Sequence, residues 1–290
     1  MYLFFNAAAV LSGNHHRFIR SIGYCSARIK IIIFAVAESG RVWPVSLFER
    51  LTKPVIRVVV PESDIASRQK EIDHFYMLLA YALVYKHWQP GHIPRSERRG
   101  YNIGALLVDP QNDPVFYGLN CIDSTDNATQ HGEVRAITGY IEKKKCFNLD
   151  GFTMYTTLEP CIMCAGMMTM TVVKRVVYGQ HDVGYSKAFE RLSADTSLMG
   201  GFPPYPRQVL HQASTVPFTD KLDQAYALYL ETAPEKILAL FLGSETANRI
   251  YLDAYNDFLT YAVQCPENEL LYHQATRFLQ TSMYEHTQQS

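Results

Sequence analysis

The sequence is poor in cysteine, in long apolar runs and in net charge. Six cysteines among 290 residues are too few for a disulfide-stapled scaffold, which excludes the small secreted class. The longest apolar run, residues 29–37, is interrupted by Lys30 and is about a third of the length that a membrane-spanning helix needs. No lysine or arginine precedes Arg17, so the basic start of a signal peptide is missing. We therefore expect a cytoplasmic protein without a membrane partner.

The residues that are present make an ordinary globular composition, which excludes a disordered or fibrous chain. A length of 290 residues predicts one large or two modest domains. The formal net charge of −1 hides an asymmetry, because residues 1–70 carry 10 Lys/Arg against 4 Asp/Glu and residues 151–290 carry 9 against 14. These charges are either solvated surface groups or, at the basic N-terminal part, a contact surface for an anionic partner such as nucleic acid.

Three segments are predicted along the chain. Residues 1–61 contain two β-branched runs, 29–36 and 55–60, and form a small N-terminal α/β unit. Residues 62–192 begin with a long helix and continue as strands alternating with helices, which is typical of a sheet flanked by helices. Residues 193–290 form a C-terminal extension. It starts with a Ser-, Gly- and Pro-rich loop over 193–220, placed where a lid over a site would lie, and continues as helices.

The middle segment has the clearest local patterns. Apolar residues at helical spacing, from Ile72 to Leu83, predict that one face of the first helix is buried. Strands are predicted over 102–108 and 115–121, joined as a hairpin, and again over 153–158 and 172–178. Helices are predicted over 131–144 and from Pro160 onward, since proline suits the first helical position.

Two short motifs carry chemistry in this segment. His131 starts one predicted helix, and Cys161 and Cys164 lie three residues apart at the start of the next. Imidazole nitrogen and thiolate sulfur are the ligands that zinc prefers, and a catalytic zinc ion keeps three protein ligands with one position open. The positive end of a helix dipole helps to hold both thiols as thiolates. The sequence therefore predicts a zinc site.

Glu133 follows two residues after His131 and has the chemistry of a general acid and base. Zinc lowers the pKa of a bound water toward ~7, so a neighbouring carboxylate can take its proton. The order H-x-E followed by P-C-x-x-C is the signature of zinc nucleobase deaminases. A redox CxxC pair is disfavoured, since a thioredoxin-like context is missing. A four-cysteine zinc site is disfavoured too, since no second CxxC exists among the remaining cysteines, Cys25, Cys121, Cys146 and Cys265.

These residues, with YTTLEPCIMCAGMM at 155–168 and KRVVYGQHD at 174–182, resemble the cytidine deaminase superfamily. The resemblance covers about residues 63–190, and within the superfamily it is greatest to bacterial tRNA adenosine deaminases and guanine deaminases. It implies a three-layer α/β/α fold with a five-stranded sheet, a zinc ion held by His131, Cys161 and Cys164, and Glu133 as proton shuttle. Residues 1–60 and those after about 220 have no counterpart in the family core.

The resemblance also implies two substrate contacts and an assembly. Asn120, at the end of a predicted strand, matches an asparagine that hydrogen-bonds the base, although a strand-end turn role fits it equally well. Gly132 replaces a common alanine whose backbone faces the base, which widens the pocket slightly. Relatives assemble as dimers or tetramers, so a homodimer is expected.

The sequence thus predicts hydrolytic deamination of a nucleobase, with adenosine in tRNA or another structured RNA as the substrate. A free base, nucleoside or nucleotide, of the guanine or cytosine type, is the alternative within the same chemistry. A non-catalytic zinc-binding partner of a deaminase is the alternative outside it, and the presence of Glu133 disfavours it.

Overall fold

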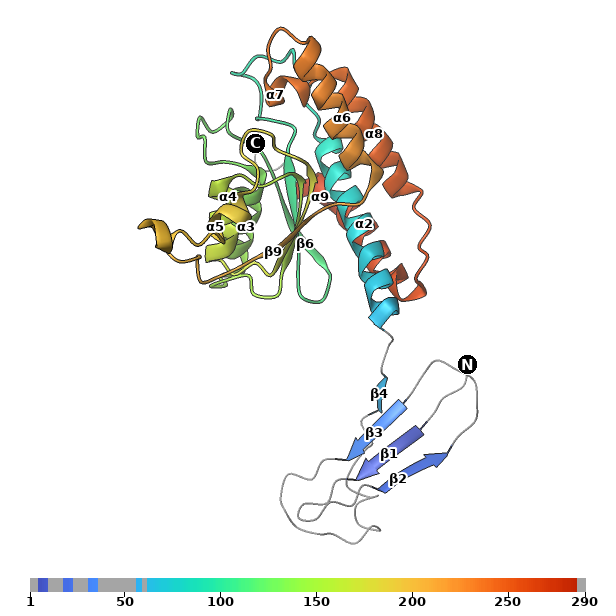
Figure 1. The fold of residues 1–290 in the computed structure, drawn as a ribbon. Coiled ribbons are helices and arrows are strands. Elements are labelled where there is room, and N and C mark those ends of the chain that lie inside the picture. Colours follow the sequence, from blue (N-terminus) through green and yellow to red (C-terminus); the bar gives the residue numbers. More distant parts are fainter. Residues whose placement is uncertain (1–4, 10–17, 23–30, 36–55, 59–61, 286–290) are drawn as a thin grey trace. The chain divides into compact units, whose positions relative to one another are not determined.

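The structure, a computed structural model, describes residues 5–9, 18–22, 31–35, 56–58 and 62–285 (Figure 1). The chain forms two compact units, Met1–Gln69 and Lys70–Ser290. The predicted division into segments 1–61, 62–192 and 193–290 stays a prediction.

The first unit contains a four-stranded sheet with the order β2-β1-β3-β4. Its strands are β1 (Phe5–Ala9), β2 (Phe18–Ile22), β3 (Ile31–Ala35) and β4 (Ile56–Val58). β1 pairs antiparallel with β2 and parallel with β3, and β4 pairs antiparallel with β3. β3 and β4 fall inside the two β-branched runs. The strands are the part of the predicted α/β unit that falls among the described residues.

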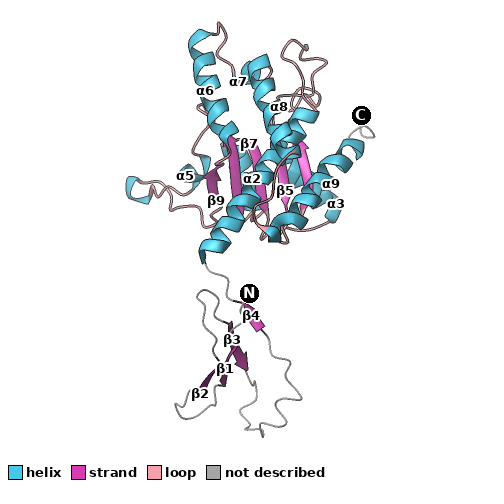
Figure 2. Ribbon diagram, turned by 90° about the vertical axis from the view of Figure 1, so that its right-hand side faces the viewer, coloured by secondary structure: helices cyan, strands magenta, loops and turns pink. Residues whose placement is uncertain are grey.

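The second unit is built on a mixed five-stranded sheet with the order β6-β5-β7-β8-β9. Its strands are β5 (Gly104–Val108), β6 (Pro114–Leu119), β7 (Thr153–Leu158), β8 (Arg175–Gln180) and β9 (Leu210–Ala213). The predicted hairpin is present, because β5 pairs antiparallel with β6. β5 is also antiparallel to β7, whereas β7, β8 and β9 run parallel. Figure 2 shows the strands side by side.

Helices cover both faces of this sheet, which confirms the predicted three-layer arrangement (Figure 1). One face carries α3 (Gly132–Lys144), α4 (Ile162–Met170) and α5 (Ala188–Leu192). The other carries α2 (Glu62–Lys86), α6 (Pro217–Thr232), α8 (Glu245–Leu259) and α9 (Glu269–Glu285), while α7 (Leu238–Phe241) connects α6 to α8. Side-chain alternation along β5 produces two cores, since Leu107 packs with α3 and α4, and Leu106 packs with α2. No helix among the described residues is long and apolar enough to cross a membrane.

α2 is buried all round from Phe75 to Val84, rather than on one face as predicted. The C-terminal helices cover its second face, since the ring of Tyr251 on α8 packs at 5.1 Å from that of Tyr81 and the ring of Tyr272 on α9 at 5.9 Å from that of Phe75. A helix that is apolar all round belongs in a core. The C-terminal extension therefore shares one hydrophobic core with α2.

Two local predictions were wrong. The predicted loop 193–220 contains β9, which completes the sheet by pairing with β8. Residues of β9 alternate between exposed and half-buried, and this apolar signal is too weak to predict a strand. The strand predicted to begin at Val172 begins at Arg175, because Val172 turns the chain with a φ of 62°. A positive φ is strained for a β-branched residue and ends any strand.

Candidate metal centre and active site

His131 is held at the N-terminus of α3 by the loop that precedes it. It is the N-cap residue, with extended backbone angles, and its carbonyl accepts the first helical hydrogen bond from Arg135. The loop is closed by the N–H of Cys121, which donates to the carbonyl of Gln130 at 2.9 Å, and by the N–H of His131, which donates to Thr129 at 2.8 Å. The imidazole is therefore presented at the end of the sheet where β6 and β7 finish.

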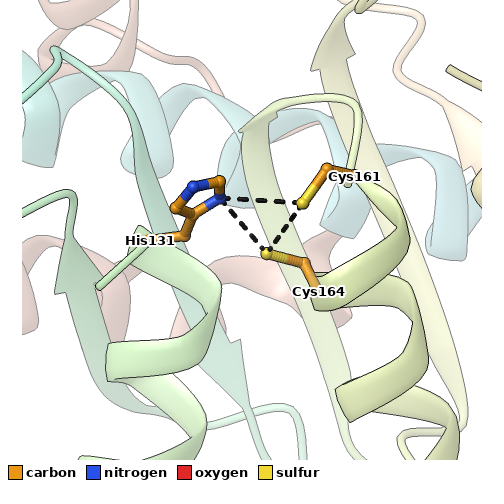
Figure 3. Close-up of side chains that lie close together, drawn as sticks. All are labelled: His131, Cys161 and Cys164. Atoms are coloured by element: carbon orange, nitrogen blue, oxygen red, sulfur yellow. Dashed lines mark hydrogen bonds between the residues drawn. The ribbon is translucent and has the colours of Figure 1, made fainter. Parts of the chain in front are cut away.

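Cys161 and Cys164 come from the start of α4. Cys161 is the N-cap residue and Cys164 lies in the first turn. The helix begins at Ile162, so Pro160 precedes the helix instead of occupying its first position as predicted. The consequence for the site is small, since both sulfurs still face His131 (Figure 3).

The three side chains form a compact group of metal-ligand atoms. His131 Nδ1 lies 3.7 Å from Cys161 Sγ and 3.6 Å from Cys164 Sγ, and the two sulfurs are 3.7 Å apart. A tetrahedral zinc ion with bonds of about 2.3 Å to sulfur and about 2.1 Å to nitrogen requires about 3.8 Å between sulfurs and about 3.6 Å between sulfur and nitrogen. The donor set and its spacing therefore fit zinc, as predicted.

The electrostatics of the group favour a negative charge on Cys161. Its hydrogen bond with Cys164 lowers the pKa of Cys161 to about 4 against the effect of burial, and His131 adds to the shift. The same hydrogen bond with Cys161, together with burial, raises the pKa of Cys164. The hydrogen bond with Cys161 raises the pKa of His131 against desolvation, and nearby acidic groups, Glu133 and Asp182 among them, act in the same direction. Such a cluster attracts a cation.

Glu133 is buried beside this group, with only 3% of its surface exposed. Oε1 accepts a hydrogen bond of 3.2 Å from Thr156 Oγ1, whereas Oε2 has no hydrogen-bond partner among the described residues. Burial raises the pKa of this carboxyl, against the opposing effects of its own backbone N–H, of His131 and of Thr156. A buried acceptor without a partner is costly, so this oxygen is available to a ligand beside the three metal-ligand atoms.

The two predicted substrate contacts lie in the same part of the sheet but have structural roles. Asn120 is buried after β6, where its Oδ1 accepts hydrogen bonds from the N–H groups of Tyr101 at 3.1 Å and Ile122 at 3.4 Å. Gly132 lets the first turn of α3 pack directly on the sheet, since a Cβ there would lie 3.0 Å from both Gly104 Cα and Gly118 O. Their contact with a base stays a prediction.

Two residues that organise the site were not predicted from the sequence. Thr156 on β7 orients Glu133, and a polar residue inside an otherwise buried strand was the available signal. Glu159 accepts hydrogen bonds from the N–H groups of Asp182 at 3.2 Å and Lys187 at 2.8 Å, and so fixes the loop after β8. A carboxylate that caps backbone amides has no sequence signature.

Of the remaining described cysteines, Cys121 and Cys146 are free thiols, and neither they nor Cys265 join the metal group. Cys25 lies outside the described residues.

Comparison with known proteins agrees with this site. Residues 71–180 match the family model of the cytidine and deoxycytidylate deaminase zinc-binding region, and this stretch includes all three ligands and Glu133. Residues 71–180 are therefore similar to the zinc-binding region of these deaminases. We call residues 71–180 the deaminase region.

Curated relatives resemble the chain over this region. The tRNA-specific adenosine deaminase of Haemophilus influenzae is 33% identical over 119 residues, which are 41% of this chain and 64% of that protein. The chain thus spans a little under two thirds of that relative's length.

Two solved structures are similar at low sequence identity. One, from work on A-to-I editing by tRNA:A34 deaminases, is 24% identical with a TM-score of 0.32, over 39% of this chain and 82% of the other. Guanine deaminase from Nitrosomonas europaea is 16% identical with a TM-score of 0.34, over 77% of this chain and 97% of the other.

Proposed function

We propose that the chain is a zinc-dependent enzyme that hydrolytically deaminates a nucleobase, and that its substrate is adenosine in tRNA or another structured RNA. The observation that carries the chemistry is the buried, unpartnered oxygen of Glu133 next to the three metal ligands. The name of the relative from Haemophilus influenzae supports the choice of substrate.

The residues divide the work as follows. His131, Cys161 and Cys164 would hold the zinc ion, which supplies a Lewis acid that lowers the pKa of water. Glu133 takes the proton of the attacking water and delivers it to the ring nitrogen beside the amine-bearing carbon. The water oxygen bonds to that carbon. Glu133 then carries the second proton to the departing amine, the carbon–nitrogen bond breaks, and ammonia leaves with a carbonyl in its place.

Thr156 keeps Glu133 in position for both transfers. Its hydroxyl donates a hydrogen bond to Oε1, so Oε2 is the oxygen that exchanges protons. Burial of the carboxyl suits this task, since a raised pKa lets it hold a proton between the two steps. A non-catalytic zinc protein would have no use for such a carboxyl, which supports the enzymatic proposal over that alternative.

The test is ammonia release from a panel containing an RNA hairpin with a loop adenosine, free adenosine, guanine and cytosine. Glu133→Gln is expected to keep its zinc, measured by elemental analysis, and to lose turnover by at least 100-fold, the lower part of the range for general acid–base catalysis. Glu190→Gln, an exposed glutamate on α5, is the control and should remain active.

Each result has a clear meaning. Ammonia from the hairpin supports the RNA substrate. Ammonia from guanine or cytosine alone would replace it with the free-base alternative. A Glu133→Gln variant as active as wild type would overturn the chemistry. The expected homodimer and the cytoplasmic location stay predictions.

A further inference from the structure

A histidine that follows β8 and an aspartate of the C-terminal extension form a two-point contact. The N–H of His181 donates to Asp223 Oδ1 at 2.9 Å, and His181 Nδ1 lies 2.6 Å from Asp223 Oδ2. His181 directly follows β8, whereas Asp223 belongs to α6 of the C-terminal extension. The C-terminal extension therefore binds the first residue after the deaminase region.

This contact lies at the same end of the sheet as the metal centre. The carbonyl of Gln180, the residue before His181, accepts a hydrogen bond of 2.8 Å from the N–H of Glu159. Cys161 lies two residues after Glu159. Asp182, the residue after His181, donates a hydrogen bond of 3.2 Å from its N–H to Glu159 Oε2. Asp182 is also among the groups that, after Cys161, raise the pKa of His131. His181 therefore follows the strand next to β7, at the sheet end that carries Cys161.

The imidazole of His181 is held in one orientation. Because a carboxylate oxygen can only accept, the neutral tautomer that fits this contact carries its proton on Nδ1 and presents Nε2 as an acceptor. The ring of Tyr178 meets the ring of His181 at 88° with 5.6 Å between centroids, which fixes the ring plane. The side chain is 48% exposed, and Nε2 has no partner among the described residues. An acceptor oriented in this way and left open suits a ligand that donates a hydrogen bond.

We propose that His181 determines substrate specificity by accepting, at Nε2, a hydrogen bond from a sugar hydroxyl of the substrate, with Asp223 as its positioning residue. This inference rests on the proposed function and deepens it. A nucleotide in RNA has a 2′-hydroxyl, which is the donor that separates RNA from DNA, and a free base has none. The C-terminal extension therefore takes part in choosing a ribose-containing substrate.

His181→Asn separates this role from a purely structural one. The asparagine amide can still donate to Asp223 in place of Nδ1, but nothing replaces Nε2. The variant should keep the melting temperature and the kcat of the wild type. Its KM for an RNA hairpin with a loop adenosine should rise roughly 3- to 10-fold, the range that one neutral hydrogen bond supplies. The same hairpin with deoxyribose in its loop should bind wild type and variant equally.

Asp223→Asn tests the positioning role. This variant should also have a higher KM for the ribose hairpin, and it should no longer discriminate between ribose and deoxyribose loops. His211→Asn is the matched control, because His211 pairs with Glu190 at 3.4 Å but lies on β9 opposite Val176, away from the end of the sheet that holds the metal ligands. It should leave the discrimination unchanged.

Affinity is measured in parallel by fluorescence anisotropy of the two hairpins, in a Glu133→Gln background that does not depend on turnover. Tighter binding of the ribose hairpin that His181→Asn abolishes supports the proposal. Equal binding of both hairpins by the parent, or equal losses on both in the variant, overturns it. Absence of ammonia release by wild type would reject the proposed function, and the affinity comparison would still decide the role of His181.

Discussion

Thr156 Oγ1 on β7 lies 3.2 Å from Glu133 Oε1 on α3, so a strand hydroxyl orients the buried carboxyl beside the metal ligands. The hydroxyl and the carboxyl are both buried. This contact joins the central sheet to the helix that carries His131, and it determines which carboxyl oxygen stays open.

Replacing Thr156 by valine removes this hydrogen bond at nearly constant volume. We expect kcat to fall roughly 10-fold, the equivalent of about 1.4 kcal/mol, because Glu133 loses the donor that orients it. Zinc content should not change, since no ligand is touched. Thr156→Ser, which restores the hydroxyl, should recover most of the activity. An unchanged kcat in Thr156→Val would show that the contact does not position Glu133.

The metal ligands are expected to act as one group. Cys164→Ser should remove most of the bound zinc, because a hydroxyl is a poor substitute for a thiolate at a soft-ligand site. Elemental analysis measures the loss directly. Cys146→Ser is the control, since Cys146 is a free thiol outside the group. A strong chelator should lower the melting temperature of the wild type and leave that of Cys164→Ser unchanged. Equal zinc in all three proteins would contradict the site.

Two glycines in different surroundings should respond oppositely to alanine. A Cβ on Gly118 would lie 2.2 Å from the carbonyl oxygen of Gly132 and 2.5 Å from the amide of Ala136, which is backbone that cannot move without lifting α3. We expect Gly118→Ala to cost about 3 kcal/mol of unfolding free energy. A Cβ on Gly166, inside α4, meets nothing within 4 Å.

Gly166→Ala should therefore stabilise the protein by about 0.5–1 kcal/mol through helix propensity. Urea unfolding of the three proteins measures both effects. A Gly118→Ala variant as stable as wild type would mean that α3 does not approach the sheet so closely.

Glu71 should make the stability depend on pH in acid. Its buried carboxylate accepts hydrogen bonds from the backbone N–H groups of Gln264 and Cys265 and from the Asn268 side chain, tying α2 to the segment before α9. Burial raises its pKa, but these hydrogen bonds together lower it below the ordinary 4.5. The stabilisation is therefore complete above about pH 4.5 and is lost as the pH falls through the lowered value.

Glu71→Gln should lower the free energy of unfolding by about 2 kcal/mol at pH 7, because the NH₂ group of the glutamine would face hydrogen-bond donors. The difference in unfolding free energy between the two proteins should shrink below pH 4.5, as followed by urea unfolding at several pH values. A constant difference from pH 7 to pH 3 would contradict the argument.

The chemistry of the site was readable from the sequence to the extent that it is local. His131, Glu133, Cys161 and Cys164 lie in two short motifs at helix starts, and each helix start was predicted to within two residues. Strand β7 was predicted with its observed bounds, because threonine and tyrosine favour strands and turn residues flank the segment. β9 was missed because four residues of mixed polarity become a strand only through pairing with β8.

By itself, the sequence predicted His131, Cys161 and Cys164 as metal ligands and Glu133 as the reacting carboxyl, since donor chemistry and spacing are properties of the residues. Only the tertiary structure decided how they are used. It set the ligand atoms 3.6 to 3.7 Å apart and left one oxygen of Glu133 without a partner. It also placed Asp223 against His181, 42 positions earlier in the chain. Such contacts depend on how α3, α4 and α6 pack on a common sheet, because packing brings together residues that no local pattern connects.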